Sequence, residues 1–216
     1  MKLLELFSGQ GSISATFKEN GFEAYRVDWS DKVEAELHAD IMTLTVEQII
    51  DLCGGVPDVV WASPQCTTYS IAIHIHRTKK EGLEPKTESA AYDDLVNVAM
   101  WHLIDNLLLA GTRYYFVENP RGRMRHMKFV QDKPRFTVSY CSYGRKASMK
   151  GYEHYYINKA TDIWTNHPNP SFKPLCTKST PNHVHRNSKY ADKRDYLSRG
   201  EIPKDLINFI MLISQE

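Results

Sequence analysis

The sequence lacks any long apolar run, and this absence narrows the classes of protein to which it can belong. No stretch reaches the roughly 18 apolar residues of a membrane span, and no apolar signal core follows a charged start. The four cysteines among 216 residues form no CxxC pair, a usage that suits a reducing cytoplasm. We therefore expect a cytoplasmic, membrane-free, monomeric protein with one sizeable core.

A standard zinc pattern is also missing. Cys176, His183 and His185 offer only three ligands, and their spacing fits no common zinc motif. The segment around them is rich in Asn, Lys, Pro and Ser, as polar loops are. The sequence therefore predicts a loop without a metal.

A glycine-containing loop follows the first apolar stretch of the chain. The loop Phe7-Ser8-Gly9-Gln10-Gly11-Ser12 separates an expected strand from an expected helix. This unit cradles phosphates or nucleosides, because glycine lets the backbone approach a ligand closely. The third glycine of the dinucleotide fingerprint is absent, which disfavours NAD.

Acidic residues end the next two segments. Asp28-Trp29 follows the apolar stretch at 24–27, and Asp40-Ile41 follows His38-Ala39. A carboxylate at the end of a strand can hold ribose hydroxyls, and an indole beside it can stack on a purine. The sequence thus predicts a nucleoside cofactor across the ends of three strands.

Cys66 lies in a loop that leaves a buried strand. The apolar run at 59–62 ends at Ser63-Pro64, and Cys66 follows two residues later. Loops at the carboxyl ends of parallel strands hold the ligands of α/β enzymes. A lone cysteine in a loop is more often a small hydrophobe, so its assignment depends on the other motifs.

Glu118 is a second candidate for a reactive side chain. The apolar segment Tyr114 to Val117 ends in Glu118-Asn119-Pro120, the same arrangement of strand and polar loop. Alone, such a glutamate is usually an exposed charge. The glycine, Cys and Glu loops of one α/β sheet should converge on one crevice.

These motifs resemble those of the C5-cytosine DNA methyltransferases, particularly the short phage-borne type. The resemblance covers Leu3 to Asn119 in the order of the family and includes the glycine loop, the Pro64-Gln65-Cys66 loop and Glu118-Asn119. The stretches at 140–144 and 162–166 resemble the phage-type members. The resemblance implies S-adenosylmethionine as cofactor and a flipped-out cytosine of double-stranded DNA as substrate.

The resemblance assigns Cys66 as the nucleophile that adds to C6 of cytosine and Glu118 as the group that binds N3 and the 4-amino group. It places the cofactor on the following residues: Phe7, Ser8, Gly9, Gly11, Ser12, Asp28, Trp29, Asp40, Ile41 and Pro64. A free thiol is mostly protonated at pH 7, so we expect basic neighbours to lower the pKa of Cys66.

The sequence departs from the family in several places. Gln65 replaces the second proline of the catalytic loop, and the Gln-x-Arg-x-Arg segment is not visible. Arg145, Lys146 or Lys159 is the candidate for its charge. The run from Ile73 to Pro85 has no apolar period and is predicted to be a mobile loop.

Charge is distributed unevenly along the chain. Residues 1–120 contain 9 Lys and Arg against 18 Asp and Glu, whereas residues 121–216 contain 18 against 8. The basic part is therefore expected to face a phosphate backbone. The candidate nucleic-acid contacts are Ser70, Asn119, Arg121, Arg123, Arg125, Arg145, Lys146 and Lys159.

The hydrophobic pattern predicts an α/β fold with a doubly wound, mostly parallel sheet, and the resemblance implies the Rossmann-like methyltransferase fold. Strands are expected at 3–7, 23–28, 57–62, 113–118 and 135–140, and helices at 12–20, 45–53, 88–110 and 203–214. Residues 1–120 form the cofactor-binding and catalytic half. Residues 121–200 form a loop-rich, reduced target-recognition region, and 201–216 a helix that packs back on the catalytic part.

Three functions stay open on the residues alone. The first is a DNA cytosine-5 methyltransferase with a short or degenerate recognition sequence, because few side chains remain to read base edges. The second is an RNA (tRNA) cytosine-5 methyltransferase of the same fold. The third is a catalytically silent nucleic-acid-binding relative, which the presence of both Cys66 and Glu118 disfavours.

Overall fold

The computed structural model describes residues 1–71, 75–78, 83–146, 156–177, 183–184 and 201–216. Seven strands form one sheet in the order β3-β2-β1-β4-β5-β8-β6. They are β1 (Lys2–Leu6), β2 (Glu23–Asp28), β3 (Leu37–His38), β4 (Val59–Ala62), β5 (Tyr114–Pro120), β6 (Arg135–Ser139) and β8 (Ala160–Thr165). A separate pair joins β7 (Tyr156–Ile157) to β9 (His183–Val184).

The sheet is parallel except for β8. Strands β3, β2, β1, β4 and β5 pair in parallel, and β8 runs antiparallel to both β5 and β6. The first five strands follow the doubly wound order 3-2-1-4-5. This topology confirms the predicted Rossmann-like fold class.

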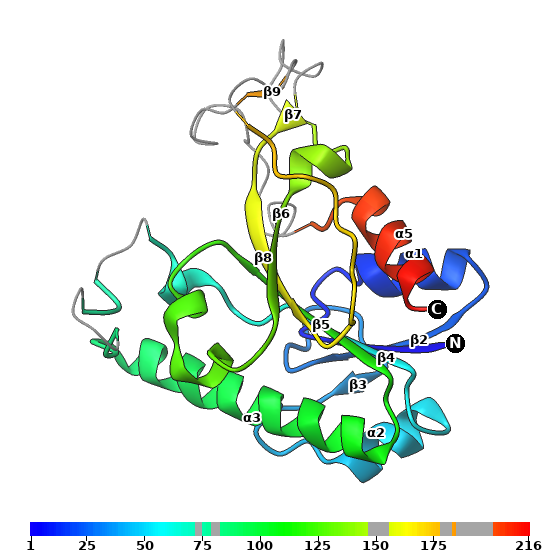
Figure 1. Cartoon of the computed structure of the whole chain (residues 1–216). Coiled ribbons are helices and arrows are strands. Elements are labelled where there is room, and N and C mark those ends of the chain that lie inside the picture. The colour runs from blue at the N-terminus through cyan, green and yellow to red at the C-terminus, as the bar shows by residue number, and fades with distance from the viewer. Residues whose placement is uncertain (72–74, 79–82, 147–155, 178–182, 185–200) are drawn as a thin grey trace.

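Helices cover both faces of the sheet, as Figure 1 shows. Alternate residues of β1 point to opposite faces, so Leu3 packs with α1 (Ser12–Glu19) and α5 (Lys204–Ile213). Leu4 packs with α2 (Val46–Cys53) and α3 (Glu88–Ala110) on the other face. The last helix, α5, therefore packs beside α1 on the same face of the sheet.

The apolar residues of α3 offer more than one candidate core face. A stripe through Leu95, Val98 and Leu103 is the apparent core face, yet Leu95 and Val98 are exposed. Met100, Ile104 and Leu107 are buried instead, together with Trp101. The helix is apolar on several sides, so its pattern alone could not fix the rotation about its axis.

The sequence predicted a loop-rich region at 121–200, and the described residues of this region include regular elements. It contributes β6 and β8 to the main sheet, and short 3-10 turns lie at Met124–His126, Lys128–Val130 and Tyr140–Tyr143. The predicted boundary at residue 120 coincides with no break in the sheet, because β5 pairs directly with β8.

Candidate functional site

Two adjoining cavities lie at the carboxyl ends of the parallel strands. The first has a volume of about 370 Å³ and the second of about 390 Å³, sizes typical of small-ligand sites. Phe7 and Gln65 line both. The sheet order reverses between β1 and β4, and such a switch point is where open α/β sheets bind ligands.

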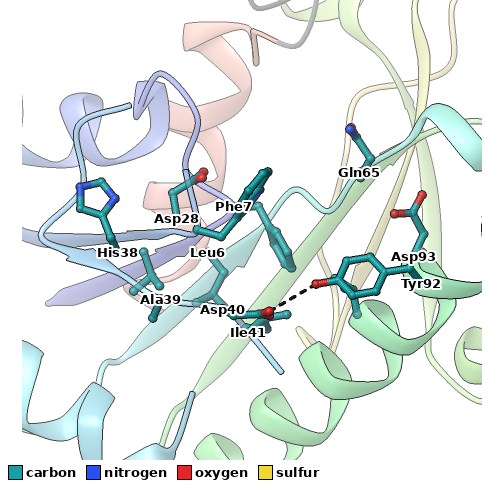
Figure 2. A pocket seen from close by; sticks show the side chains of 13 residues that line it. Leu6, Phe7, Asp28, His38, Ala39, Asp40, Ile41, Gln65, Tyr92 and Asp93 are labelled. Atoms are coloured by element: carbon teal, nitrogen blue, oxygen red, sulfur yellow. Dashed lines mark hydrogen bonds between the residues drawn. The ribbon is translucent and has the colours of Figure 1, made fainter. Parts of the chain in front are cut away.

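The first cavity is formed by the ends of β1, β2 and β3 on one side and by α3 on the other (Figure 2). The cavity is lined by four residues that were expected to hold a nucleoside cofactor, Asp28, Trp29, Asp40 and Ile41. The indole of Trp29 is 76% exposed, which leaves a face open for stacking.

The two carboxylates of this cavity are already hydrogen-bonded within the chain. Asp28 accepts from the backbone N–H of Gly9 at 3.0 Å and of Ser30 at 2.9 Å. Asp40 accepts from the backbone N–H of Met42 at 2.9 Å and from the Tyr92 hydroxyl at 3.3 Å. Asp28 therefore fixes the glycine loop in addition to lining the cavity, and carboxylate oxygens retain further acceptor capacity.

The loop between β1 and α1 has a left-handed backbone. Phe7, Gly9 and Gly11 have φ of 55°, 50° and 67°, and for Phe7 this conformation is uncommon. A Cβ on Gly9 would meet nothing within 4 Å, so the loop borders open space there. The Ser8 hydroxyl is buried without a hydrogen-bond partner in the described structure.

The second cavity brings together the reactive side chains. Cys66 and Glu118 both line it, one from the loop after β4 and the other from β5. Lys159, which immediately precedes β8, lines it as well. The glycine loop also lines this cavity, through Ser8, Gly9 and Ser12, and so does Pro64. The predicted convergence of the three loops is thus present, whereas Gly11 lines neither cavity.

The environment of Cys66 does not lower the pKa of its thiol, in contrast to the sequence expectation. Burial raises the pKa, and the negative charge of Glu118 raises it further. The ammonium group of Lys159 acts in the opposite direction. Burial and the charge of Glu118 therefore both favour the protonated thiol, and only the charge of Glu118 can be removed by a proton.

Glu118 is 5% exposed. Burial raises the pKa of its carboxyl group, and the charge of Lys159 and the hydrogen bond from Tyr140 partly offset this rise. The Tyr140 hydroxyl donates to Glu118 Oε1 at 2.7 Å. A protonated Glu118 is an acid that can donate to a base nitrogen.

Glu5 is a buried carboxyl group that the sequence analysis did not single out. It lines the second cavity and accepts from the backbone N–H of Ser14 at 2.8 Å and from the Ser14 hydroxyl at 2.5 Å. Burial raises its pKa to about 7. It satisfies a free N–H in the first turn of α1, which has no side-chain cap from Gly11.

A buried arginine anchors the segment after Cys66. Arg77 is 0% exposed and donates to both carboxylate oxygens of Asp94, at 2.7 and 3.0 Å. It also donates to the Thr68 carbonyl at 3.1 Å and covers the ring of Tyr69 at 4.2 Å. Of the predicted mobile loop at 73–85, residues 75–78 and 83–85 are described and include this buried anchor, and residues 73–74 and 79–82 lie outside the described structure.

Four of the predicted nucleic-acid contacts are buried or paired inside the chain, namely Asn119, Arg123, Arg125 and Arg145. Asn119 is 1% exposed and donates to the Pro64 carbonyl at 3.1 Å. The three arginines donate inside the chain. Arg123 donates to the Ser70 carbonyl, Arg125 to the side chains of Asp162 and Thr137, and Arg145 to the Glu201 carbonyl. Sequence alone could not separate these arginines from exposed ones, because their acceptors come from distant segments.

The other predicted contacts differ in position. Arg121 and Lys146 are exposed, whereas Ser70 is half-buried and lies beside Arg123. Lys159 is half-buried at the second cavity, with its Nζ 4.8 Å from the centre of the Tyr140 ring. Of the three candidates for the missing arginine segment, Lys159 is therefore the one that lines the cavity of Cys66 and Glu118.

The metal prediction is not tested by the structure. His185 lies outside the described residues, and the side chain of His183 is not described either. Elsewhere in the described chain, no group of three His, Cys, Asp or Glu side chains has the arrangement of a metal site. No helix in the described parts is both long and apolar enough to cross a membrane.

Comparisons with known proteins support this picture. No protein-family model matches the sequence. The chain is 29% identical over 170 residues to a protein of Frog virus 3 (isolate Goorha) named as a probable DNA (cytosine-5)-methyltransferase, and the match covers 76% of this chain and 70% of the viral protein.

Two solved structures show weaker likeness. A DNA modification methyltransferase encoded within a prophage (E. coli) has a TM-score of 0.48 at 16% identity, covering 76% of this chain and 46% of that one. A mutant of DNMT2 from Spodoptera frugiperda has a TM-score of 0.44 at 18% identity, with 87% and 55% covered. The chain spans about half the length of these structures.

The sheet order and the converging loops define a Rossmann-like fold with a ligand crevice at its switch point. The similarity to the viral protein confirms the resemblance that the motifs indicated. The chain therefore resembles the C5-cytosine DNA methyltransferases in its motifs and in its similarity to the viral protein.

Proposed function

We propose that this protein is an S-adenosylmethionine-dependent DNA (cytosine-5)-methyltransferase that acts through a covalent Cys66 adduct. The observation that carries the proposal is the shared cavity of Cys66 and Glu118, which adjoins the glycine loop. The two residues come from segments about 50 positions apart, and neither a structural thiol nor a surface glutamate requires this arrangement.

The residues of the first cavity fit the cofactor. Trp29 offers an indole face for a purine, and Asp28 and Asp40 offer carboxylates for hydroxyl or amino groups. Across Phe7, the unpartnered Ser8 hydroxyl and the open space at Gly9 suit the amino-acid end. When bound, S-adenosylmethionine supplies an electrophilic methyl group.

The proposed chemistry of the second cavity depends on which of Glu118 and Cys66 carries a proton. A proton on Glu118 removes the negative charge that raises the pKa of Cys66, and Lys159 then favours the thiolate. The Cys66 sulfur adds to C6 of cytosine while Glu118 donates its proton to N3, so the ring becomes a neutral enamine.

The remaining steps restore the enzyme. The cofactor, held by residues of the first cavity, would supply the methyl group to C5 and would leave as S-adenosylhomocysteine. The C5 proton is then lost to a solvent base, and its electron pair forms the C5–C6 double bond as the bond between sulfur and C6 breaks. Glu118 regains its proton from N3. In this scheme Lys159 is a charge that stabilises the thiolate rather than a proton donor.

The proposed substrate is a flipped-out cytosine of double-stranded DNA, and the protein should recognise few of the neighbouring base pairs. Arg121 and Lys146 are exposed cations of the segment after β5, and contacts to phosphates position a protein without specifying sequence. The proposal includes a short or degenerate recognition sequence read by the region 121–200, and a monomeric enzyme.

Trapping with a mechanism-based substrate tests the function. A duplex with 5-fluorocytosine should form a denaturant-stable complex with the wild type, because the fluorine at C5 cannot leave as a proton. Cys66→Ser should form none, although it should bind S-adenosylmethionine with unchanged affinity in calorimetry. Cys176→Ser is a matched control, because Cys176 is also partly exposed but lines neither cavity.

The result that contradicts the proposal is trapping that persists in Cys66→Ser or disappears in Cys176→Ser. A labelled-methyl assay with DNA and tRNA in parallel distinguishes the substrates. Transfer to RNA alone would replace the DNA assignment, and failure to transfer to either would indicate a silent binding protein.

A further inference from the structure

Tyr140 is the hydrogen-bond partner of Glu118, and none of the sequence motifs assigns it a role. It begins the 3-10 turn after β6, and its side chain is 0% exposed. Its hydroxyl donates to Glu118 Oε1 at 2.7 Å. A buried tyrosine hydroxyl needs one partner, but here the partner is the acid of the candidate active site.

The hydrogen bond distinguishes the two oxygens of the Glu118 carboxyl group. Oε1 accepts from Tyr140, so a proton on the neutral carboxyl group resides on Oε2. Glu118 lines the second cavity, and the proton must point there to reach a base nitrogen. The tyrosine thus selects the oxygen that carries the proton and holds the rotation of the carboxyl group.

The same tyrosine organises the charges beside Glu118. Its backbone N–H donates to the Lys159 carbonyl at 3.1 Å, and its carbonyl accepts from the Arg145 N–H at 3.1 Å. Its ring lies 4.8 Å from Lys159 Nζ and 5.6 Å from the Arg145 guanidinium carbon. Cations over an aromatic face are attracted to it, so Tyr140 holds both cations near the carboxyl group.

We propose that Tyr140 is a positioning residue that directs the Glu118 proton toward the substrate cytosine. The inference rests on the proposed function and adds to it a residue that acts through Glu118 without touching the base. The charged groups that affect Glu118 are Lys159, Arg145, Asp162 and Cys66, and replacing the Tyr140 hydroxyl alters none of them.

Tyr140→Phe tests the proposal, because it removes one oxygen and keeps the buried ring. A hydrogen bond to the charged form lowers the pKa of an acid, so its loss should raise the pKa of Glu118. The rate of 5-fluorocytosine trapping should fall by roughly two- to tenfold, as expected for one hydrogen bond to a neutral carboxyl group. The Michaelis constants for DNA and cofactor should stay unchanged.

Tyr143→Phe is the matched control. Tyr143 lies in the same turn and is also buried, but its hydroxyl accepts from the backbone N–H of Lys173 at 2.8 Å. It should alter thermal stability without moving the pKa of Glu118. In a Glu118→Gln background, Tyr140→Phe should produce no further decrease in trapping.

The pKa of Glu118 is followed by carbon NMR of labelled carboxyl groups, a measurement that needs no activity. An unmoved pKa in Tyr140→Phe overturns the proposal, and so does a raised pKa with unchanged trapping. If the pKa moves but the wild type neither traps nor methylates DNA, the proposed function fails while the control of the Glu118 proton by Tyr140 stands.

Discussion

Replacing Arg77 with methionine should produce a large loss of stability, because the guanidinium group is fully buried. Methionine keeps most of the aliphatic stem and removes the donors to Asp94 and to the carbonyls of Thr68, Leu83 and Ala90. Removing one partner of a buried ion pair costs about 3–5 kcal/mol. For a chain of 216 residues, each kcal/mol lowers the melting temperature by about 2–4 °C.

The Asp94 side chain is 22% exposed, so water can replace part of its lost contact, and the value should lie near the lower end of that range. Urea unfolding followed by tryptophan fluorescence measures the change. Lys204→Met is the control, because its pair with Glu19 is 63% and 58% exposed and should contribute less than about 1 kcal/mol. Equal losses in the two variants would refute the reasoning.

Two further predictions concern charge. Burial raises the pKa of Glu5 from 4.5 to about 7, so the folded protein keeps a proton that the unfolded chain releases as the pH rises through that interval. The stability of the wild type should therefore fall relative to Glu5→Gln, by up to about 3 kcal/mol between pH 4.5 and 7.5 in urea unfolding; a constant difference would exclude this. Arg121→Ala should lower the slope of DNA affinity against salt by about one, whereas Arg125→Ala should mainly destabilise the fold, because Arg125 pairs with Asp162. Equal slopes for the two variants in fluorescence anisotropy would contradict this distinction.

The strands and loops of the first 120 residues could be predicted because each has a signal in its own local sequence. A strand of apolar residues followed by a glycine, a proline or a carboxylate is visible without knowledge of distant segments, and β2 was predicted with the bounds that the structure has. The convergence of Cys66 and Glu118 followed from topology, since parallel strands end on one side of a sheet.

Strand β8 was missed because its pattern does not alternate. Within Ala160–Thr165, all residues after the first are buried, since β8 lies between β5 and β6 and is covered on both faces. Its sequence includes Thr161 and Asp162, which read as polar. Asp162 is accommodated by the ion pair with Arg125, a contact between segments 37 positions apart that no local pattern reveals.

The environment of the reactive groups could not be predicted for the same reason. Cys66 and Glu118 were identified from their own loops, but their pKa values depend on Lys159, and that of Glu118 also on Tyr140. Both partners enter the site through the hairpin of β6 and β8. The sign of a pKa shift depends on burial and neighbouring charges, and these are set by the assembled sheet.

The antiparallel pairing of β5 with β8 has a consequence for the order in which the protein is made. A ribosome releases β5 about 40 residues before β8, and in that interval the apolar strand with Glu118 is an unprotected edge of a growing sheet. Such edges recruit other chains. The nascent enzyme is therefore most prone to aggregate just before its active site is completed, and a fragment that ends ahead of residue 160 should be insoluble while still containing Cys66 and Glu118.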